Sequence, residues 1–360
     1  MKNYSYKFRI LPTENQKEIL SRYFWCGRFI YNYYLNKSIQ DYQQNKDKKW
    51  NKYEYVKDIV NLKKENERLK EVNSQSLQSV VENLDKAYNK FFTKWWWFPS
   101  FKKKWSKQST KIPQFFKVEW NRIHIPKMKE WIKFIKDREI EWKIKSLTLS
   151  QDTDWKYYVS ILVEREITKL SKTWKSVGCD LGVKDLLITS DWDVYKTLKR
   201  KNESKIWRLQ MRQSKKQKWS RRYKQLKTKI ARLHKADANR RNDYNHKISI
   251  QLVRNYDLIW LENLNVKWMM KNHKIANSVW SQWWYELVTK LTYKSDRYWK
   301  QAHQISRWYP TSKQCYQCWN VKQSLKLSER TYVCECWYKE DRDINASKNI
   351  LRYTEIELKL

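Results

Sequence analysis

Three short stretches of this chain each deliver an acidic residue, and this pattern constrains the fold more than any other feature. Val177–Val183 places Asp180 at the end of an apolar run, beside a glycine turn. Asp257–Glu262 places Glu262 at the end of a second apolar run, and Asp341–Asn345 adds acids near the C-terminus. Short apolar runs of this kind are typical of strands that are buried in a sheet. We therefore predict an α/β domain in which three acids from separate elements meet at one sheet edge.

The net charge of +39 indicates which partners the chain binds. It arises from 77 Lys and Arg residues against 38 Asp and Glu residues. Such an excess favours a polyanion, either a nucleic acid or an anionic membrane surface. No apolar run approaches the roughly 18 residues of a membrane span, and residues 1–4 begin a strand-like alternation without a signal-peptide core. We expect no membrane partner and a cytoplasmic, nucleoid-associated protein.

The glycine and tryptophan contents are both unusual. The 360 residues include 3 Gly and 23 Trp, whereas about 25 glycines are expected at an average frequency of about 7%. Several tryptophans stand where a turn favours glycine, among them Trp155, Trp192, Trp319 and Trp337. An indole side chain disfavours the positive φ that glycine adopts freely. Our hypothesis is that the gene uses UGA for glycine and that UGA has been read as tryptophan; the alternative is a protein that is truly rich in tryptophan.

Periodicity along the chain predicts an ordered series of strands and helices. Thr13 is a predicted helix N-cap, and Gln16 closes a capping box. The pattern predicts a strand at 4–10, helices at 13–35 and 77–92, an aromatic and basic loop at 94–107, short strands within 112–165, a three-strand meander up to 197, a helical hairpin at 198–247, a buried strand at 258–262, a helix at 284–298 and a final helix from about 345.

The long segment 198–247 is strongly basic. Leu226, Ile230 and Leu233 form one apolar seam of the predicted hairpin. A charged helix pair that is only solvated would show the same composition, but the sign bias favours a surface that contacts phosphates. The candidate nucleic-acid-binding residues are Lys199, Arg200, Lys201, Arg221, Arg222, Arg240 and Arg241.

Four of the six cysteines form two close pairs. Cys315 and Cys318 make a C-x-x-C pair, and Cys334 and Cys336 make a C-x-C pair 15 residues further on. Four thiolates at this spacing predict a tetrahedral, structural Zn²⁺ site, because four sulfur ligands leave no open position for a substrate. Two redox or incidental pairs are the alternative. The remaining cysteines, Cys26 and Cys179, are predicted to be buried packing residues.

The three acids suit a metal-dependent phosphodiesterase. Hydrolysis of a phosphodiester needs an activated water and a stabilised leaving oxygen, and two Mg²⁺ ions about 3.5–4 Å apart serve both needs. Such hard ions prefer carboxylate oxygens. We predict that Asp180 bridges the ions and that Glu262 and Asp343 flank it. Asp341 is the alternative to Asp343, which we favour because it leads directly into the final helix.

Motifs along nearly the whole chain resemble those of one known family. They are Phe8–Thr13 with Gln16, Arg28–Asn32, Trp97–Lys102, Val177–Val183, Glu262–Val266, Arg307–Lys313 before the cysteine pairs, and Asp341–Asn345. In this order and spacing the chain resembles the TnpB (OrfB) proteins of bacterial insertion sequences, which are relatives of the type V CRISPR effector nucleases. The resemblance places Asp180, Glu262 and Asp343 on the three RuvC acids, and Cys315, Cys318, Cys334 and Cys336 on the zinc ligands.

The resemblance implies a domain layout and an activity. It implies an N-terminal wedge β-barrel over residues 1–170 with a helical recognition insert at about 12–110. A RuvC-like, RNase H-type nuclease domain would span 171–306, include the basic hairpin 198–247, be interrupted by a zinc ribbon at 307–338, and resume over 339–360. Family members use a guide RNA transcribed from the element's end and cut target DNA beside a short element-adjacent motif, although they are often labelled transposases.

The resemblance also has departures, and other functions stay open. Relatives usually have glycine at the positions of Trp25, Trp97, Trp192, Trp268, Trp299, Trp319 and Trp337. One alternative function is a non-catalytic nucleic-acid-binding accessory or regulator of transposition, although a pure binder has no use for three acids facing phosphate. The other is a transposase that joins strands with the same acid chemistry.

Overall fold

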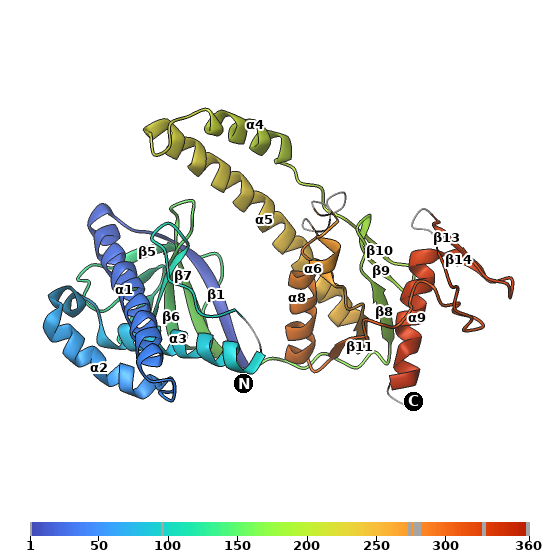
Figure 1. The fold of residues 1–360 in the computed structure, drawn as a ribbon, viewed down its shortest axis with the longest axis horizontal. Coiled ribbons are helices and arrows are strands. Elements are labelled where there is room, and N and C mark those ends of the chain that lie inside the picture. Colours follow the sequence, from blue (N-terminus) through green and yellow to red (C-terminus); the bar gives the residue numbers. More distant parts are fainter. Residues whose placement is uncertain are drawn as a thin grey trace. The chain divides into compact units, whose positions relative to one another are not determined.

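The chain divides into two compact units. The computed structural model describes residues 2–94, 97–272, 276, 279, 282–325 and 329–357 (Figure 1). Unit 1 comprises Met1–Glu166 with Trp219–Ala231, and unit 2 comprises Ile167–Lys218 with Arg232–Leu360. The chain therefore leaves unit 1 after residue 166, returns to it at Trp219, and passes back into unit 2 within one long helix, α5 (Arg221–Asn255).

Unit 1 is built on a seven-stranded antiparallel sheet with the order β2-β6-β7-β1-β5-β4-β3. Its strands are β1 (Lys2–Leu11), β2 (Gln108–Ile112), β3 (Lys117–Glu119), β4 (Arg122–His124), β5 (Ile132–Ile135), β6 (Lys143–Gln151) and β7 (Tyr157–Arg165). Tyr6, Phe8 and Ile10 alternate into the core because successive strand side chains point to opposite faces. A barrel was predicted, but β2 and β3 end the strand order, and no pairing between them closes the sheet in the described residues.

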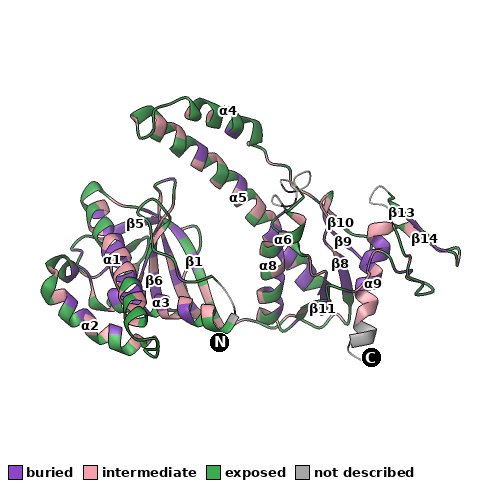
Figure 2. Ribbon diagram, viewed as in Figure 1, coloured by how far each residue is buried: buried purple, intermediate pink, exposed green. Residues whose placement is uncertain are grey.

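Helices pack against this sheet and complete the first core. They are α1 (Glu14–Gln44), α2 (Lys52–Glu65), the short 3₁₀ helix η1 (Glu67–Glu71) and α3 (Ser74–Lys94). The predicted capping box is confirmed, since Thr13 and Gln16 exchange side-chain-to-backbone hydrogen bonds at the start of α1. The apolar stripe of α3, with Leu77, Val81 and Leu84, is buried as its helical spacing predicts. In Figure 2, buried and exposed stretches alternate along α1 and α2, as expected of helices that bury one face.

Unit 2 contains a five-stranded mixed sheet with the order β10-β9-β8-β11-β12. Its strands are β8 (Ser176–Asp180), β9 (Asp185–Thr189), β10 (Val194–Lys196), β11 (Leu258–Leu261) and β12 (Gln301–Gln304). The predicted three-strand meander is confirmed as β8, β9 and β10, which pair antiparallel. Strands β8, β11 and β12 run parallel to one another, so their carboxyl ends lie at the same edge.

Both faces of the second sheet are covered. Ile259 and Leu261 of β11 face a core shared with α5 and α8 (Trp284–Arg297). Trp260, which lies between them in the strand, packs instead with Ile350 of α9 (Arg342–Glu357). This division follows from the period of two along a strand. The same alternation places Gly178 and Asp180 on the face that carries α9.

The predicted helical hairpin is confirmed as α4 (Glu203–Ser214) and α5. The side-chain amide of Asn202, before α4, donates to Asp237 of α5. Helix α5 continues past the predicted end at 247, because Ile248, Leu252 and Val253 are buried against the sheet of unit 2. A short helix, α6 (Val266–Met269), follows β11. None of the helices in the described ranges has the length and hydrophobicity that a membrane span requires.

Candidate metal-dependent active site

Two of the predicted acids extend from neighbouring parallel strands. In the register of β8 and β11, Leu261 lies opposite Cys179. Asp180 ends β8, and Glu262 is the first residue after β11, so each acid is one residue beyond that pair. The backbone N–H of Glu262 donates to the carbonyl of Cys179 at 3.4 Å, which extends the pairing to the acids. Parallel alignment therefore brings both carboxylates to one edge of the sheet.

The third predicted acid comes from the helix that packs on β8. Asp343 lies in the first turn of α9. Helix α9 can approach the strand because residue 178 is glycine: a Cβ there would lie 2.1 Å from the Ser347 carbonyl oxygen and 2.5 Å from the Leu351 nitrogen. At Gly182, likewise, a Cβ would lie 2.7 Å from the Asp185 oxygen. Neither glycine has a positive φ. Both glycines are therefore required because another part of the chain approaches closely, and not because the backbone is left-handed.

The electrostatics of this corner show that the acids influence one another. Burial raises the pKa of Asp180 well above its usual range, and the neighbouring Glu262 carboxylate raises it further through repulsion and a shared hydrogen bond. Burial also raises the pKa of Glu262, with Asp343 adding repulsion. Partly buried carboxylates that repel one another need a nearby cation to be ionised together. Their oxygen donors suit a hard divalent ion.

Two arginines lie near the acids and were not predicted from the sequence. Arg342 Nε lies 3.5 Å from Asp343 Oδ1, and Arg330 Nη1 lies 3.8 Å from Asp343 Oδ2. Arg342 also lowers the pKa of Asp180, against the larger effects that raise it. Arg342 stands between Asp341 and Asp343 in the sequence, which was the available signal.

Asp341, the alternative ligand, caps a helix. Its Oδ1 accepts hydrogen bonds from the backbone N–H groups of Asp343 at 2.9 Å and Ile344 at 3.3 Å. This is the N-cap geometry that satisfies free donors at a helix start. The arrangement leaves Asp343 as the acid of this pair that interacts with Asp180.

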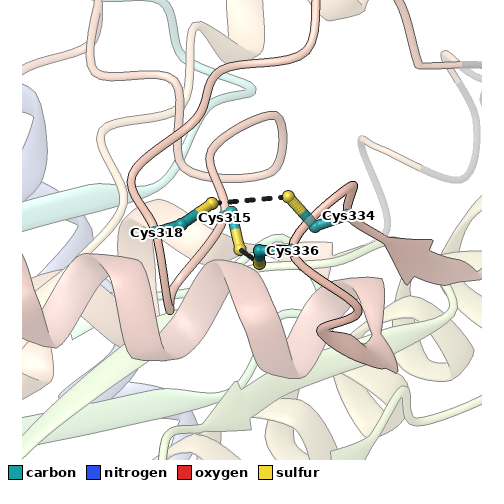
Figure 3. A group of neighbouring side chains, drawn as sticks. All are labelled: Cys315, Cys318, Cys334 and Cys336. Carbon is teal, nitrogen blue, oxygen red and sulfur yellow. Dashed lines mark hydrogen bonds between the residues drawn. The ribbon is translucent and has the colours of Figure 1, made fainter.

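The four predicted zinc ligands converge: Cys334 and Cys336 lie in the turn between β13 (Thr331–Val333) and β14 (Lys339–Asp341), next to Cys315 and Cys318. The sulfur of Cys315 lies 3.6 Å from that of Cys336, and the sulfur of Cys318 lies 3.5 Å from that of Cys334 (Figure 3). A tetrahedral ion with sulfurs at about 2.3 Å would separate them by about 3.8 Å. All four cysteines are free thiols, so the group could bind a metal.

Two asparagines of α9 tie the cysteine segment to the acids. Asn345 accepts a hydrogen bond from the Tyr316 backbone N–H at 3.1 Å and donates to the Gln314 carbonyl at 2.8 Å. Asn349, one turn later, donates to the carbonyls of Thr311 and Gln314. Both asparagines are buried. Their i, i+4 spacing in the sequence indicates that both side chains lie on the same face of the helix. The sequence does not indicate that this face contacts the metal-binding segment.

The predicted nucleic-acid-binding residues occupy several places along the helical hairpin. Lys199, Lys201, Arg221, Arg222 and Arg240 are exposed, as phosphate contacts require. Arg200 and Arg241 are partly buried; Arg200 pairs with Glu203, and the Arg241 guanidinium lies 4.9 Å from the Trp283 ring centre.

The two cysteines outside the zinc group, Cys26 and Cys179, are both buried, as predicted.

Family models match three parts of the chain. A family described as "Probable transposase" matches residues 158–273, "Cas12f1-like, TNB domain" matches residues 284–350, and "Helix-turn-helix domain" matches residues 1–47. The first match contains Asp180 and Glu262, and the second contains Asp343 with the four cysteines.

Relatives and one solved structure extend over nearly the whole chain. A "Putative RNA-guided DNA endonuclease" of Streptomyces pristinaespiralis is 32% identical over 96% of this chain and 88% of its own length. "Putative RNA-guided DNA endonuclease InsQ" of Escherichia coli K12 is 31% identical over 96% of this chain and 91% of its own length. A structure of Cas12f1 with sgRNA and target DNA shares the fold, with a TM-score of 0.58 at 14% identity over 94% of this chain and 83% of that one. The chain therefore belongs to the TnpB/OrfB family of insertion-sequence proteins.

Proposed function

We propose that this chain is an RNA-guided DNA endonuclease encoded by an insertion sequence, and that it hydrolyses phosphodiester bonds at the corner formed by Asp180, Glu262 and Asp343. The observation that carries the proposal is the convergence of these acids from β8, β11 and α9. The names of the relatives support it independently. The five-stranded sheet, with its meander and parallel strands, supports an RNase H-like, RuvC-type domain formed by residues 171–306 and 339–360.

The three acids would hold two Mg²⁺ ions. Asp180 lies on β8, which pairs with β11 and is in close contact with α9, so it would be shared between the ions, with Glu262 and Asp343 each completing one site. The ions would supply an activated water and charge stabilisation at the leaving oxygen. The chain's own contribution is to hold the carboxylates in place: strand pairing aligns Asp180 with Glu262, and Gly178 lets α9 bring in Asp343. Arg342 and Arg330 orient the Asp343 carboxylate.

The four cysteines would hold a structural Zn²⁺ ion within a ribbon at residues 307–338. Their sulfur spacing fits one tetrahedral ion, and four thiolates leave no position for catalysis. Because Asn345 and Asn349 join this segment to α9, a formed ribbon would also stabilise the helix that carries Asp343.

The proposed partners are a target DNA and a guide RNA from the element's end. The charge of +39 supports contacts to phosphate, and the relative structure was determined with an sgRNA and target DNA. Exposed basic residues of the helical hairpin, such as Arg221 and Arg222, are the proposed phosphate contacts. The N-terminal wedge domain at 1–170, with its helical insert at about 12–110, would take part in recognising the adjacent DNA motif.

The test is guide-dependent cleavage of a matched DNA in Mg²⁺. Asp180→Ala should lower the cleavage rate by at least about 10³-fold, equivalent to about 4 kcal/mol of lost transition-state stabilisation. Binding of the guide RNA should persist. Asp341→Ala is the matched control, since this nearby acid caps α9 and should cost only about 1 kcal/mol of stability. Equal cleavage by Asp180→Ala would refute the site.

Two other results would change the proposed function. Guide-RNA binding without any cleavage by the unmutated chain would favour a non-catalytic accessory or regulator of transposition. Joined DNA strands among the products would favour a transposase, the description of the family model that matches 158–273. Cleavage products with free ends, formed only with a matching guide, would support the endonuclease.

A further inference from the structure

Tryptophan occupies most of the backbone positions where this fold needs a left-handed conformation. Eleven described non-glycine residues have a positive φ, and nine of them are tryptophan. They are Trp120, Trp155, Trp174, Trp192, Trp219, Trp283, Trp299, Trp319 and Trp337, with φ from 48° to 70°. None of the chain's three glycines has a positive φ. Glycine adopts this region without steric cost, whereas a bulky side chain there is an outlier.

Three of these positions share one hairpin geometry. In the turn between β9 and β10, the Thr189 N–H donates to the Asp193 carbonyl at 3.0 Å, and the Trp192 N–H donates to the Thr189 carbonyl at 3.2 Å. The same two bonds recur at Trp155, between β6 and β7, and at Trp337, between β13 and β14. This is the three-residue hairpin loop whose left-handed residue is characteristically glycine.

A fourth position ends a helix. After α8, the Trp299 N–H donates to the Asp296 carbonyl at 3.4 Å, and the Lys300 N–H donates to the Ser295 carbonyl at 2.8 Å. These two bonds define a Schellman motif, with Trp299 at the position that follows the C-cap. Glycine is the usual residue there, because the position requires a positive φ.

All nine indoles keep more than a third of their surface accessible, although Trp155 and Trp219 contact the ring of Trp105. The least exposed of them, Trp283, keeps 37% of its surface accessible, and Trp337 keeps 93%. Several lie near lysine or arginine side chains, as the exposed Trp174 does near the exposed Lys172. Such exposed cation–π pairs are the weakest class of that interaction. The nine positions therefore share their backbone conformation, and none of them holds a buried indole.

Other tryptophans have side chains that the fold uses. Trp50 lies between the rings of Tyr55 and Tyr88, at centroid distances of 4.7 and 4.6 Å, and its Nε1 donates to Asp85 at 2.9 Å. Trp142 is parallel to the Tyr6 ring, and the Arg165 guanidinium lies 4.2 Å from its ring centre. Neither has a positive φ. The structure thus separates two classes of tryptophan.

We propose that the native protein carries glycine at the nine left-handed positions and tryptophan at 50 and 142, because its host reads UGA as glycine. Independent mutations would not place one residue type at nearly every such position. A single decoding rule would place tryptophan at all of these positions, because UGA differs by one base from the tryptophan codon UGG and by one base from the glycine codon GGA. The backbone supports no assignment for Trp25, Trp97 and Trp268, where relatives usually have glycine, because their φ values are not positive.

The direct test is peptide mass spectrometry of the protein purified from the organism that carries the gene. We expect glycine at positions 155, 192, 299 and 337 and tryptophan at 50 and 142. Tryptophan at the first four would overturn the decoding rule. Glycine at 50 or 142 would overturn the separation of the two classes, even if UGA proves to be recoded.

A stability comparison of the full-length recombinant chain tests the backbone argument separately. Trp299→Gly should raise Tm by roughly 2–4 °C by removing the left-handed strain. Trp50→Gly is the matched control and should lower Tm, since it removes a packed ring and a hydrogen bond. A variant with glycine at all nine left-handed positions keeps the test informative if a single substitution shifts Tm only slightly. Its Tm should exceed that of the parent. A lower Tm for both Trp299→Gly and the nine-glycine variant would refute the proposal.

Discussion

Replacing Gly178 with alanine tests whether close packing of α9 on β8 sets the geometry of the proposed active site. An alanine Cβ would lie 2.1 Å from the Ser347 carbonyl oxygen, whereas real Cβ contacts essentially never fall below 3.0 Å, so α9 must retreat by about 1 Å. Overpacking of this kind costs about 1–3 kcal/mol of stability. Asp343 lies one helical turn before Ser347, so the same displacement should move it away from Asp180. A misplacement of about 1 Å can lower a reaction rate about 10²-fold.

The assay is single-turnover cleavage of guide-matched DNA in Mg²⁺, measured beside Tm for each variant. Gly27→Ala is the matched control, because a Cβ at Gly27 of α1 would lie 3.6 Å from the Val80 side chain of α3, which is an ordinary contact distance. It should leave cleavage unchanged and raise stability slightly, by about 0.5–1 kcal/mol. If Gly178→Ala cleaves at the parental rate with unchanged Tm, α9 is not seated on β8 as described. A lower Tm with unchanged cleavage would remove Asp343 from the site.

Three further predictions concern zinc, pH and salt. Cys334→Ser should abolish bound zinc measured by elemental mass spectrometry and lower Tm, whereas Cys26→Ser should retain zinc; equal zinc in both variants would refute the ligand assignment. Although burial opposes it, hydrogen bonds from a lysine and two backbone N–H groups lower the pKa of Asp257 to about 2. This folded-state pKa lies below the unfolded value of about 3.9, so the ionised Asp257 stabilises the fold, and Asp257→Asn should lower the free energy of unfolding by about 2 kcal/mol at pH 7. Denaturant titrations should show that the difference in free energy between the parent and the variant shrinks as the pH falls from about 4 towards 2. Replacing Arg221 and Arg222 with alanine should reduce the slope of log affinity for nucleic acid against log salt concentration by roughly 2. An unchanged slope would exclude both residues as phosphate contacts.

Local sequence patterns predicted most of the secondary structure because they depend on neighbouring residues. The capping box of Thr13 and Gln16 marks the start of α1, and the spacing of Leu77 and Leu84 marks the buried face of α3. The hairpin's second helix was predicted too short, since the basic composition ends near residue 247 while its apolar packing continues. The chain becomes less basic near residue 247, but the helix continues because its apolar residues are buried against a sheet whose strands are distant in the sequence.

Pairings between distant segments could not be read from local patterns. The family resemblance implied a barrel for the first unit, whereas the described strands form a sheet whose end strands are not paired with each other. Strand order depends on which backbones hydrogen-bond across long separations, and residue periodicity does not encode the partner. The roles of Arg330, Asn345 and Asn349 escaped prediction for the same reason, because each acts on a segment brought near only by folding.

The sequence alone determined the chemical groups available to this protein: three acids at the ends of separate elements, four thiols at metal-binding spacing, a large positive charge and an excess of tryptophan over glycine. Only the tertiary structure decided how they combine. Parallel pairing of β8 and β11 aligned Asp180 with Glu262, and the missing side chain of Gly178 let α9 bring Asp343 to them. Backbone angles then separated tryptophans that pack from those in glycine-like turns. The physical reason is that composition and spacing specify chemistry, whereas proximity and φ arise only when the whole chain packs.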